Sequence, residues 1–241
     1  SAQVSELGIT FASKSVEGKS NEIPAVQQLI SELDVQDCLI VADALNCQRE
    51  TAQAVVQGGG DYLFNAKGNQ STTADGIREY VQDESLRKTM DRKAIKEKSR
   101  DRIECRTAYV TTDISWLSGK EKWTNLCCIG AIKTEFEKKG LKTEEWHYYI
   151  SSRKLTASDL LHHARMEWAV ETMHWLLDVH YAEDYSRIEN GTIQQNLNML
   201  RKFSLSLIKQ FKAKSKSKRA ISQIMFSCLL DPLTICSILE N

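Results

Sequence analysis

The sequence predicts an α/β fold: a mixed sheet flanked by helices, an antiparallel β-rich insertion and a helical C-terminal segment. Three observations support this class. Apolar runs typical of strands alternate with helical periodicity in residues 1–66, β-like runs recur in residues 67–152, and helical periodicity dominates residues 153–241. A chain of 241 residues can bury a sizeable core, either as one domain with an insertion or as two small domains.

The first segment alternates strands and helices. Apolar residues from Val4 to Val16 predict one or two strands broken near Gly8, so we expect the chain to begin within a sheet. Residues 20–33 have apolar side chains at helical spacing, and Pro24 is tolerated in the first turn of such a helix.

A short apolar run, residues 38–43, forms the centre of the predicted sheet. It does not alternate with polar residues and is too short for a helix, which predicts a strand buried on both faces. The run ends at Asp43, which places this carboxylate at the carboxyl end of the strand, where ligand groups collect in open α/β sheets. A helix over 48–57 and a strand over 62–66 follow, so we expect parallel pairing with right-handed crossovers.

The character of the sequence changes after Lys67. A polar helix (about 72–83) leads into a charged connector, residues 87–101. Three β-like runs then follow, at 103–112, 126–136 and 144–151, and short links between them predict an antiparallel insertion.

From Thr156 onward all segments are predicted to be helical. Thr156 or Ser158 can cap the first helix, a second helix covers about 192–211, and shorter apolar helices fill 220–239 with an interruption at Pro232.

Composition excludes several classes of protein. With 32 basic and 32 acidic residues, the net charge favours no particular partner. The seven cysteines form no C-x-x-C pair and lie mostly among apolar residues, which favours reduced thiols in a cytoplasmic protein over a zinc site. No leader and no apolar run of roughly 20 residues is visible, so we expect no membrane span.

Two acids are candidates for chemistry. Glu171 shares one helix face with His174 and Asp178, and this polar stripe either lines a site or faces solvent on an ordinary amphipathic helix. Asp43 could serve catalysis, or it could form a turn or cap the next helix.

Polar and basic residues suggest where nucleic acid would bind. Lys67, Asn69 and Gln70 follow a strand and suit phosphate and base-edge contacts, although an ordinary polar loop has the same composition. Arg102 and Arg106 share one face of a strand with Glu104, so they either contact DNA or pair with that acid. Residues 201–219 hold eight basic residues and no acid, which indicates a phosphate-binding cluster or a solvated face.

Five segments together resemble the H-repeat-associated group of DDE-type insertion-sequence transposases. They occur in the family's order: Asp43-Ala44-Leu45-Asn46-Cys47-Gln48; Asp61-Tyr62-Leu63 running into Lys67-Gly68-Asn69-Gln70; Arg102-Ile103-Glu104-Cys105-Arg106-Thr107; Tyr148-Tyr149-Ile150-Ser151-Ser152; and Glu171 to Val179 with Glu183-Asp184 and Arg187. The resemblance extends from about Val4 to Phe211.

The resemblance implies a ribonuclease H-like core and Mg²⁺-dependent cleavage and strand transfer of DNA, the element ends and the target, possibly by a homodimer assembled on DNA. Three carboxylates would hold two Mg²⁺ ions, with Mn²⁺ as a substitute; Asp43 matches the second acid and Glu171 the third. Lys67, Asn69, Gln70, Arg102, Arg106, Arg165 and Arg187 would contact DNA, and His174 and Asp178 would play supporting roles.

This sequence departs from the family pattern in two places. The family's first Asp lies on a strand before the residues that match 4–16, so we expect this chain alone to bind metal weakly and not to transpose. Glu167 stands where many relatives have Arg or His, with Arg165 nearby as a partial substitute. A metal-dependent nuclease, or an inactive or domesticated remnant that only binds DNA, are the alternative functions.

Overall fold

The computed structural model describes residues 2–4, 9–12, 22–99, 102–138, 141–182, 185, 187–188 and 190–240, without the side chains of 2–4, 9–12, 99, 102, 138 and 167–171. The chain divides into two compact units. One consists of residues 16–167 and the other of residues 1–15 together with 168–241.

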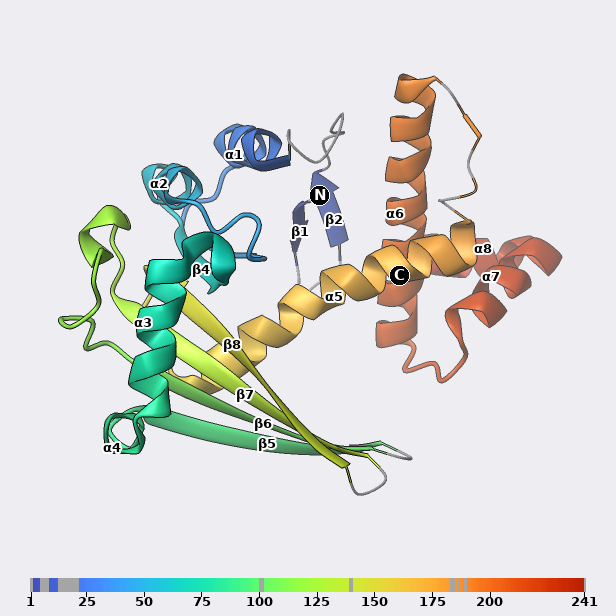
Figure 1. The fold of residues 1–241 in the computed structure, drawn as a ribbon. Helices are drawn as coiled ribbons and strands as arrows, with labels where there is room; N and C mark the ends of the chain where they lie inside the picture. The colour runs from blue at the N-terminus through green and yellow to red at the C-terminus, as the bar shows by residue number, and fades with distance from the viewer. Residues whose placement is uncertain are drawn as a thin grey trace. The chain divides into compact units, whose positions relative to one another are not determined.

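Unit 16–167 is built on a six-stranded mixed sheet with the strand order β3-β4-β8-β7-β6-β5 (Figure 1). The strands are β3 (Leu39–Ala42), β4 (Asp61–Ala66), β5 (Asp91–Ser99), β6 (Arg102–Thr111), β7 (Cys128–Lys138) and β8 (Leu141–Ser151). Only β3 and β4 pair in parallel among them, as predicted, and the other neighbours are antiparallel. The expected mixed α/β class and antiparallel insertion are confirmed.

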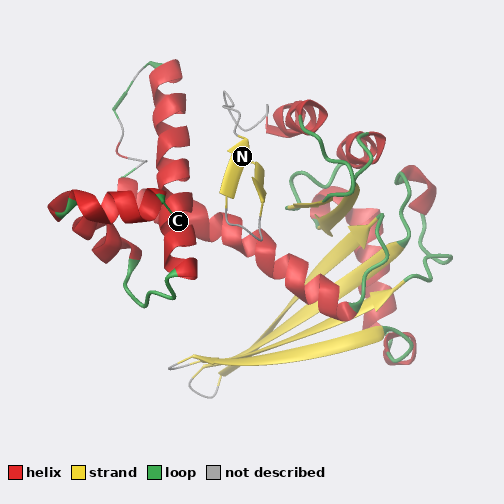
Figure 2. Ribbon diagram, turned by 180° about the vertical axis from the view of Figure 1, so that it is seen from behind, coloured by secondary structure: helices red, strands yellow, loops and turns green. Residues whose placement is uncertain are grey.

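Helices cover both faces of this sheet. The helices α1 (Glu22–Glu32), α2 (Arg49–Gln57) and α3 (Ser71–Gln82) pack on one face, followed by a short α4 (Glu84–Arg87). The first turns of α5 (Ala157–Tyr181) pack on the other face, as the opposite views in Figures 1 and 2 show. Strand residues alternate between the two layers, because neighbouring side chains point to opposite faces of a sheet.

The pairing of β4 with β8 joins the insertion to the core sheet. Side chains reinforce the ladder: Ser151 Oγ donates to the Tyr62 carbonyl at 2.7 Å, and Ser152 Oγ donates to Asp61 Oδ1 at 2.8 Å. Arg153 Nε completes the joint with an ion pair to Asp61 Oδ2 at 2.8 Å. The β-rich insertion therefore continues the core sheet.

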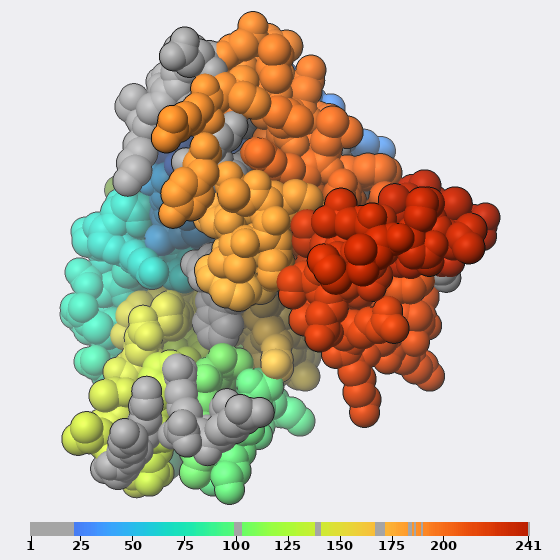
Figure 3. Space-filling model, turned by 90° about the vertical axis from the view of Figure 1, so that its right-hand side faces the viewer, coloured from blue at the N-terminus to red at the C-terminus, as the bar shows by residue number. Residues whose placement is uncertain are grey.

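The second unit contains a small sheet and helices. Strands β1 (Ala2–Val4) and β2 (Ile9–Ala12) pair antiparallel in a sheet of their own, which differs from the expected position within the main sheet. Besides the end of α5, the helices are α6 (Gly191–Lys214), α7 (Ile221–Leu230) and α8 (Pro232–Leu239). The surface of α7 and α8, red in Figure 3, exposes apolar side chains that include Leu229, Leu230 and Leu233.

Two helix boundaries follow the predicted signals. Thr156, not Ser158, caps α5: its Oγ1 accepts from the Asp159 amide at 3.2 Å while Asp159 Oδ2 accepts from the Thr156 amide at 2.9 Å. Pro232 begins α8, where its missing N–H removes no helical hydrogen bond.

Two expectations about strands were wrong. The strand β3 is only half-buried, because it is an edge strand of the described sheet. Residues 91–99, expected within a charged connector, form the strand β5, which pairs along its length with β6. Charged side chains are common on exposed edge strands. A search for runs of apolar residues therefore does not detect β5.

The seven cysteines are free; Cys47 and Cys128 are buried, whereas Cys38 and Cys236 are exposed. Burial raises the pKa of Cys128 to about 11, so its thiol stays protonated. Within the described residues, no helix combines the length and apolar character needed to cross a membrane.

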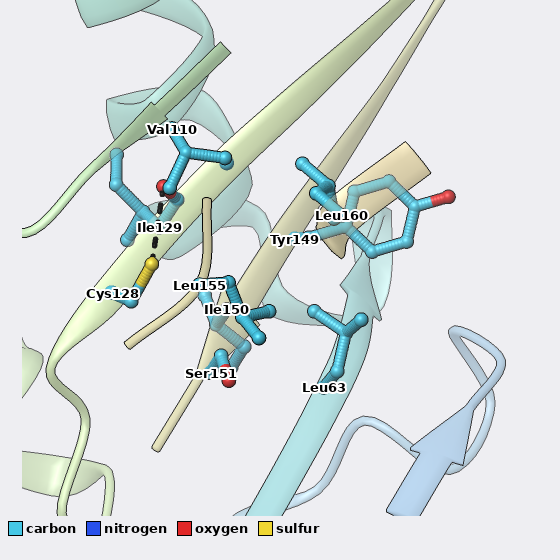
Figure 4. Close-up of a pocket in the computed structure, with 10 residues that line it drawn as sticks. Leu63, Val110, Cys128, Ile129, Tyr149, Ile150, Ser151, Leu155 and Leu160 are labelled. Atoms are coloured by element: carbon cyan, nitrogen blue, oxygen red, sulfur yellow. Dashed lines mark hydrogen bonds between the residues drawn. The ribbon is translucent and has the colours of Figure 1, made fainter. Parts of the chain in front are cut away.

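Gly130 lets α5 approach the sheet closely. It lies beside a small apolar cavity of about 10 Å³ lined by Val110, Tyr149 and Leu160 (Figure 4). A Cβ atom at position 130 would lie 2.5 Å from Leu160 Cδ2 and 3.2 Å from the Tyr109 carbonyl oxygen. The space is therefore too small even for one methyl group.

We predict that Gly130→Ala lowers the free energy of unfolding by about 1–3 kcal/mol, because overpacking displaces Leu160. Urea denaturation monitored by circular dichroism measures this change. Gly191→Ala is the matched control, since no atom lies within 4 Å of its added Cβ. Equal stability of both variants would show that α5 can shift without cost.

Candidate active site at the carboxyl end of β3

Asp43 lies directly after β3 and is exposed. Its Oδ1 accepts hydrogen bonds from the backbone amide of Asn46 at 3.2 Å and from Asn46 Nδ2 at 2.9 Å. Asp43 therefore forms the turn that the sequence offered as an alternative to catalysis. The turn fixes the carboxylate, while Oδ2 accepts no hydrogen bond from the described residues, so one oxygen stays available to a ligand.

Asn46 gives a test of whether this loop suits a cation. Asn46 is buried, with 8% of its surface exposed, and its Oδ1 has no hydrogen-bond partner among the described residues. Leaving such an atom unpaired costs about 1–3 kcal/mol. Carboxylate and amide oxygens are the ligands that hard divalent cations prefer. Asp43 and Asn46 therefore offer the types of oxygen that such an ion takes, although the Asn46 amide directs its Nδ2, not its Oδ1, at Asp43.

The residues after β4 hold the Asp43 loop. Asn69 Nδ2 donates to the Ala44 carbonyl at 2.6 Å, and Gln70 Nε2 donates to the Cys47 carbonyl at 3.0 Å. They lie in η2 (Gly68–Gln70), a 3-10 turn between β4 and α3. Asn69 and Gln70 thus lie at the edge of the sheet that carries Asp43, as expected, and their amide groups position its loop.

Cys47 is the buried anchor of this loop. Its side chain is fully buried, and burial followed by the negative charge of Asp43 raises the pKa of its thiol to about 12. The thiol is therefore protonated at neutral pH and packs as a small apolar group.

The arginines assigned to DNA lie among acids. Arg106, on β6, is mostly buried and forms ion pairs with Glu104 and, at 3.4 Å, with Glu97. Arg165, in the first half of α5, pairs with the same Glu97 at 2.7 Å. The ion pair that the sequence offered as an alternative for Arg106 is therefore present. Arg102 begins β6, and its side chain lies outside the described residues.

The polar stripe of α5 is only partly described. Glu171 and Glu167 belong to the helix, but their side chains lie outside the described residues. Partial burial and the charge of Lys202 lower the pKa of His174, although Asp178 acts in the opposite direction. The pairing of Glu171 with Asp43 remains a prediction.

The basic residues between 201 and 219 do not form one exposed face. Lys202 is buried, and burial lowers the pKa of Lys209. Lys212 and Lys214 lie in the last turn of α6, where cations complement the helix dipole. Arg187 is exposed, outside any described helix or strand.

No group of three or more His, Cys, Asp or Glu side chains is arranged to hold a metal ion within the described part of the chain. The signal that sequence reasoning missed is the supporting role of the amides. Asn46, Asn69 and Gln70 stand within the family-like segments, but only the geometry assigns them to the Asp43 loop.

Comparison with known proteins gives one family. A family model described as a transposase DDE domain matches residues 2–207. The putative transposase YncI of Escherichia coli O157:H7 is 29% identical over 249 aligned positions, which cover 95% of this chain and 63% of YncI. The H repeat-associated putative transposase YhhI of Escherichia coli strain K12 is 32% identical over 211 positions, covering 83% of this chain and 56% of YhhI. The chain therefore spans less than two thirds of the length of these curated relatives.

We predict that replacing Asn69 and Gln70 together by alanine loosens the loop 43–48. Two lost hydrogen bonds, each worth about 0.5–1.5 kcal/mol, amount to about 1–3 kcal/mol, so backbone amides of the loop should exchange hydrogen roughly 5- to 160-fold faster. Hydrogen–deuterium exchange with mass spectrometry measures the rate. Gln82→Ala, at an exposed position of α3, is the control. Unchanged exchange in a normally folded double variant would remove the positioning role.

Proposed function

Because the chain belongs to the family of transposases with a DDE domain, we propose that it is the catalytic-core portion of an enzyme that cuts and joins DNA. Membership confirms the resemblance to H-repeat-associated transposases and the ribonuclease H-like fold class. The observation that carries the proposal is the family match over residues 2–207. The position of Asp43 directly after β3, in a loop held by hydrogen bonds, supports it.

Asp43 and Glu171 are the proposed ligands of divalent metal, which we expect to be two Mg²⁺ ions replaceable by Mn²⁺. Bound in a pair, such ions activate the attacking oxygen and stabilise the leaving oxygen of a phosphodiester. Asp43 would offer its free Oδ2, with Oδ1 held by Asn46. His174 and Asp178 would position Glu171 from the same helix face.

The DNA would lie along the carboxyl ends of β3 and β4. Lys67 is exposed there and has no ion pair among the described residues, so its ammonium is available to a phosphate. Arg102 and Arg187 are further proposed contacts. Arg106 and Arg165 would exchange their acidic partners for phosphate, or position β5 and α5 through Glu97.

A third carboxylate is part of this proposal. The family resemblance puts the first acid on a strand before the residues that match 4–16, so we propose that the complete site adds an Asp from that strand to Asp43 and Glu171. Assembly of two copies on DNA is also part of the proposed function.

We predict that a longer chain, extended upstream in its reading frame to include that Asp, nicks DNA with Mg²⁺. Asp43→Asn and Glu171→Gln should each lower the nicking rate more than about a hundredfold, because even outer-shell changes cost 10–100-fold at metal sites. Gel analysis of labelled DNA gives the rate. Glu50→Gln, an exposed acid on α2, is the control.

The reaction products distinguish a transposase from a nuclease. Strand-transfer products with a target DNA identify a transposase, whereas cut DNA without joining identifies a nuclease. An extended, folded chain that contains all three acids and neither nicks DNA nor binds Mn²⁺ would contradict the proposed function and indicate a remnant.

A further inference from the structure

A pocket of about 290 Å³ opens beside the candidate site. It lies within the unit 16–167, where the end of β4, the start of α3 and the strand β8 meet. Its volume is at the lower end of the range for small-ligand sites, which is roughly 300–1,000 Å³. The residues that matter for its chemistry are Lys67, Ser71, Asp75, Arg78, Glu145 and His147.

One short segment belongs to both the pocket and the Asp43 loop. Lys67, Gly68 and Ser71 line the pocket, while Asn69 and Gln70 between them donate to the carbonyls of the loop. The pocket wall and the support of Asp43 are therefore one piece of backbone. A ligand in the pocket would lie next to whatever Asp43 binds.

One cation of the pocket has no acidic partner among the described residues. Arg78 forms an ion pair with Asp75 at 2.9 Å, and His147 Nε2 lies 3.2 Å from a Glu145 oxygen, a contact that is an ion pair only when the imidazole is protonated. Among the described residues Lys67 forms no ion pair. The other ring nitrogen of His147, Nδ1, is buried without a hydrogen-bond partner, which is a costly state for a polar atom. The wall thus contains a free ammonium and an unsatisfied imidazole.

We propose that this pocket binds a phosphate group of a DNA strand, next to the phosphodiester that Asp43 serves. The proposal rests on the proposed function. Lys67 supplies a charge-assisted hydrogen bond, Ser71 and the guanidinium of Arg78 supply further donors, and His147 adds a second positive charge when it is protonated. The pocket selects phosphate by charge and reads no base sequence.

Binding should depend on the protonation of His147. In the free protein, burial and the charge of Lys67 lower the pKa of His147, and Glu145 acts in the opposite direction. Arg78, Asp75 and Tyr148 are the other ionisable groups of the pocket. A bound anion offsets the charge of Lys67, so it raises the pKa of His147, and by linkage the anion binds more tightly to the protonated form. Affinity therefore falls as the pH rises through that pKa.

The test measures sulfate binding to the full 241-residue chain by NMR, following the His147 ring resonance assigned with His147→Gln. Sulfate keeps its charge between about pH 5 and 8, where histidine titrates. We expect the His147 pKa to rise on saturation. Lys67→Ala should weaken sulfate binding roughly tenfold, the value of one charge-assisted hydrogen bond, and His147→Gln should remove the pH dependence. Lys142→Ala, an exposed lysine on β8, is the control.

A second arm uses a short single-stranded oligonucleotide and fluorescence anisotropy on the same variants. Weaker oligonucleotide binding by Lys67→Ala, but not by Lys142→Ala, supports a phosphate of DNA as the ligand. Sulfate binding without any effect on the oligonucleotide would identify a site for free anions and overturn the assignment, as would the absence of sulfate binding in folded protein. Persistent nicking by the extended chain in either case would leave the proposed function intact.

Discussion

The pairing of β4 with β8 is the constraint on which the described sheet depends. The strand β4 is parallel to β3 on one side and antiparallel to β8 on the other, so it joins two kinds of sheet. Hydroxyl groups of Ser151 and Ser152 and the guanidinium of Arg153 hold the start of β4 at positions 61 and 62. These contacts hold β4 against β8. The carboxyl ends of β3 and β4 meet at one edge of the sheet because the two strands are parallel, and α3 follows β4 at that edge.

The candidate functional groups of this unit lie close together at this edge because hydrogen bonds connect the two loops there. Asp43 is fixed through Asn46, and its loop is fixed through Asn69 and Gln70, which follow the neighbouring strand. The support is made of neutral amides, which keep their hydrogen bonds at any pH and leave the charge of the carboxylate available. Burial keeps the Cys47 thiol neutral beneath them. Lys67, directly before η2, lines a pocket that contains further charged residues. The η2 turn therefore connects the loop that carries the Asp43 carboxylate to the pocket that contains the Lys67 ammonium group.

Periodicity and turn signals predicted most elements of the fold, because they report local backbone preference and burial. They predicted the bounds of α1, α2, β4 and the long helices to within a few residues. The alternation of strands and helices predicted that β3 and β4 pair in parallel. They failed where the deciding interaction is distant in the sequence. Residues 91–99 are mostly charged, and their pairing with β6 is what makes them a strand. The run at 39–42 resembles a fully buried strand, although its position at the edge of the described sheet leaves it half-buried. Motif reasoning selected Asp43, but the supporting amides and the Lys67 pocket depend on contacts that no spacing encodes.

The segments that carry the family resemblance are structural as well as chemical. Tyr62 accepts from Ser151 and donates its own hydroxyl to the Thr124 carbonyl, so two motifs meet as one joint of the sheet. Arg106 and Glu104 form an ion pair that extends through Glu97 to Arg165, tying β5 and β6 to α5. These residues contribute to folding, so a protein without catalytic activity could also retain them. The match over residues 2–207 therefore establishes the family, whereas the activity that we propose depends on a small set of carboxylates. Asp43 is the member of the proposed set whose surroundings are described: its Oδ1 is held by Asn46, and its Oδ2 accepts no hydrogen bond from the described residues.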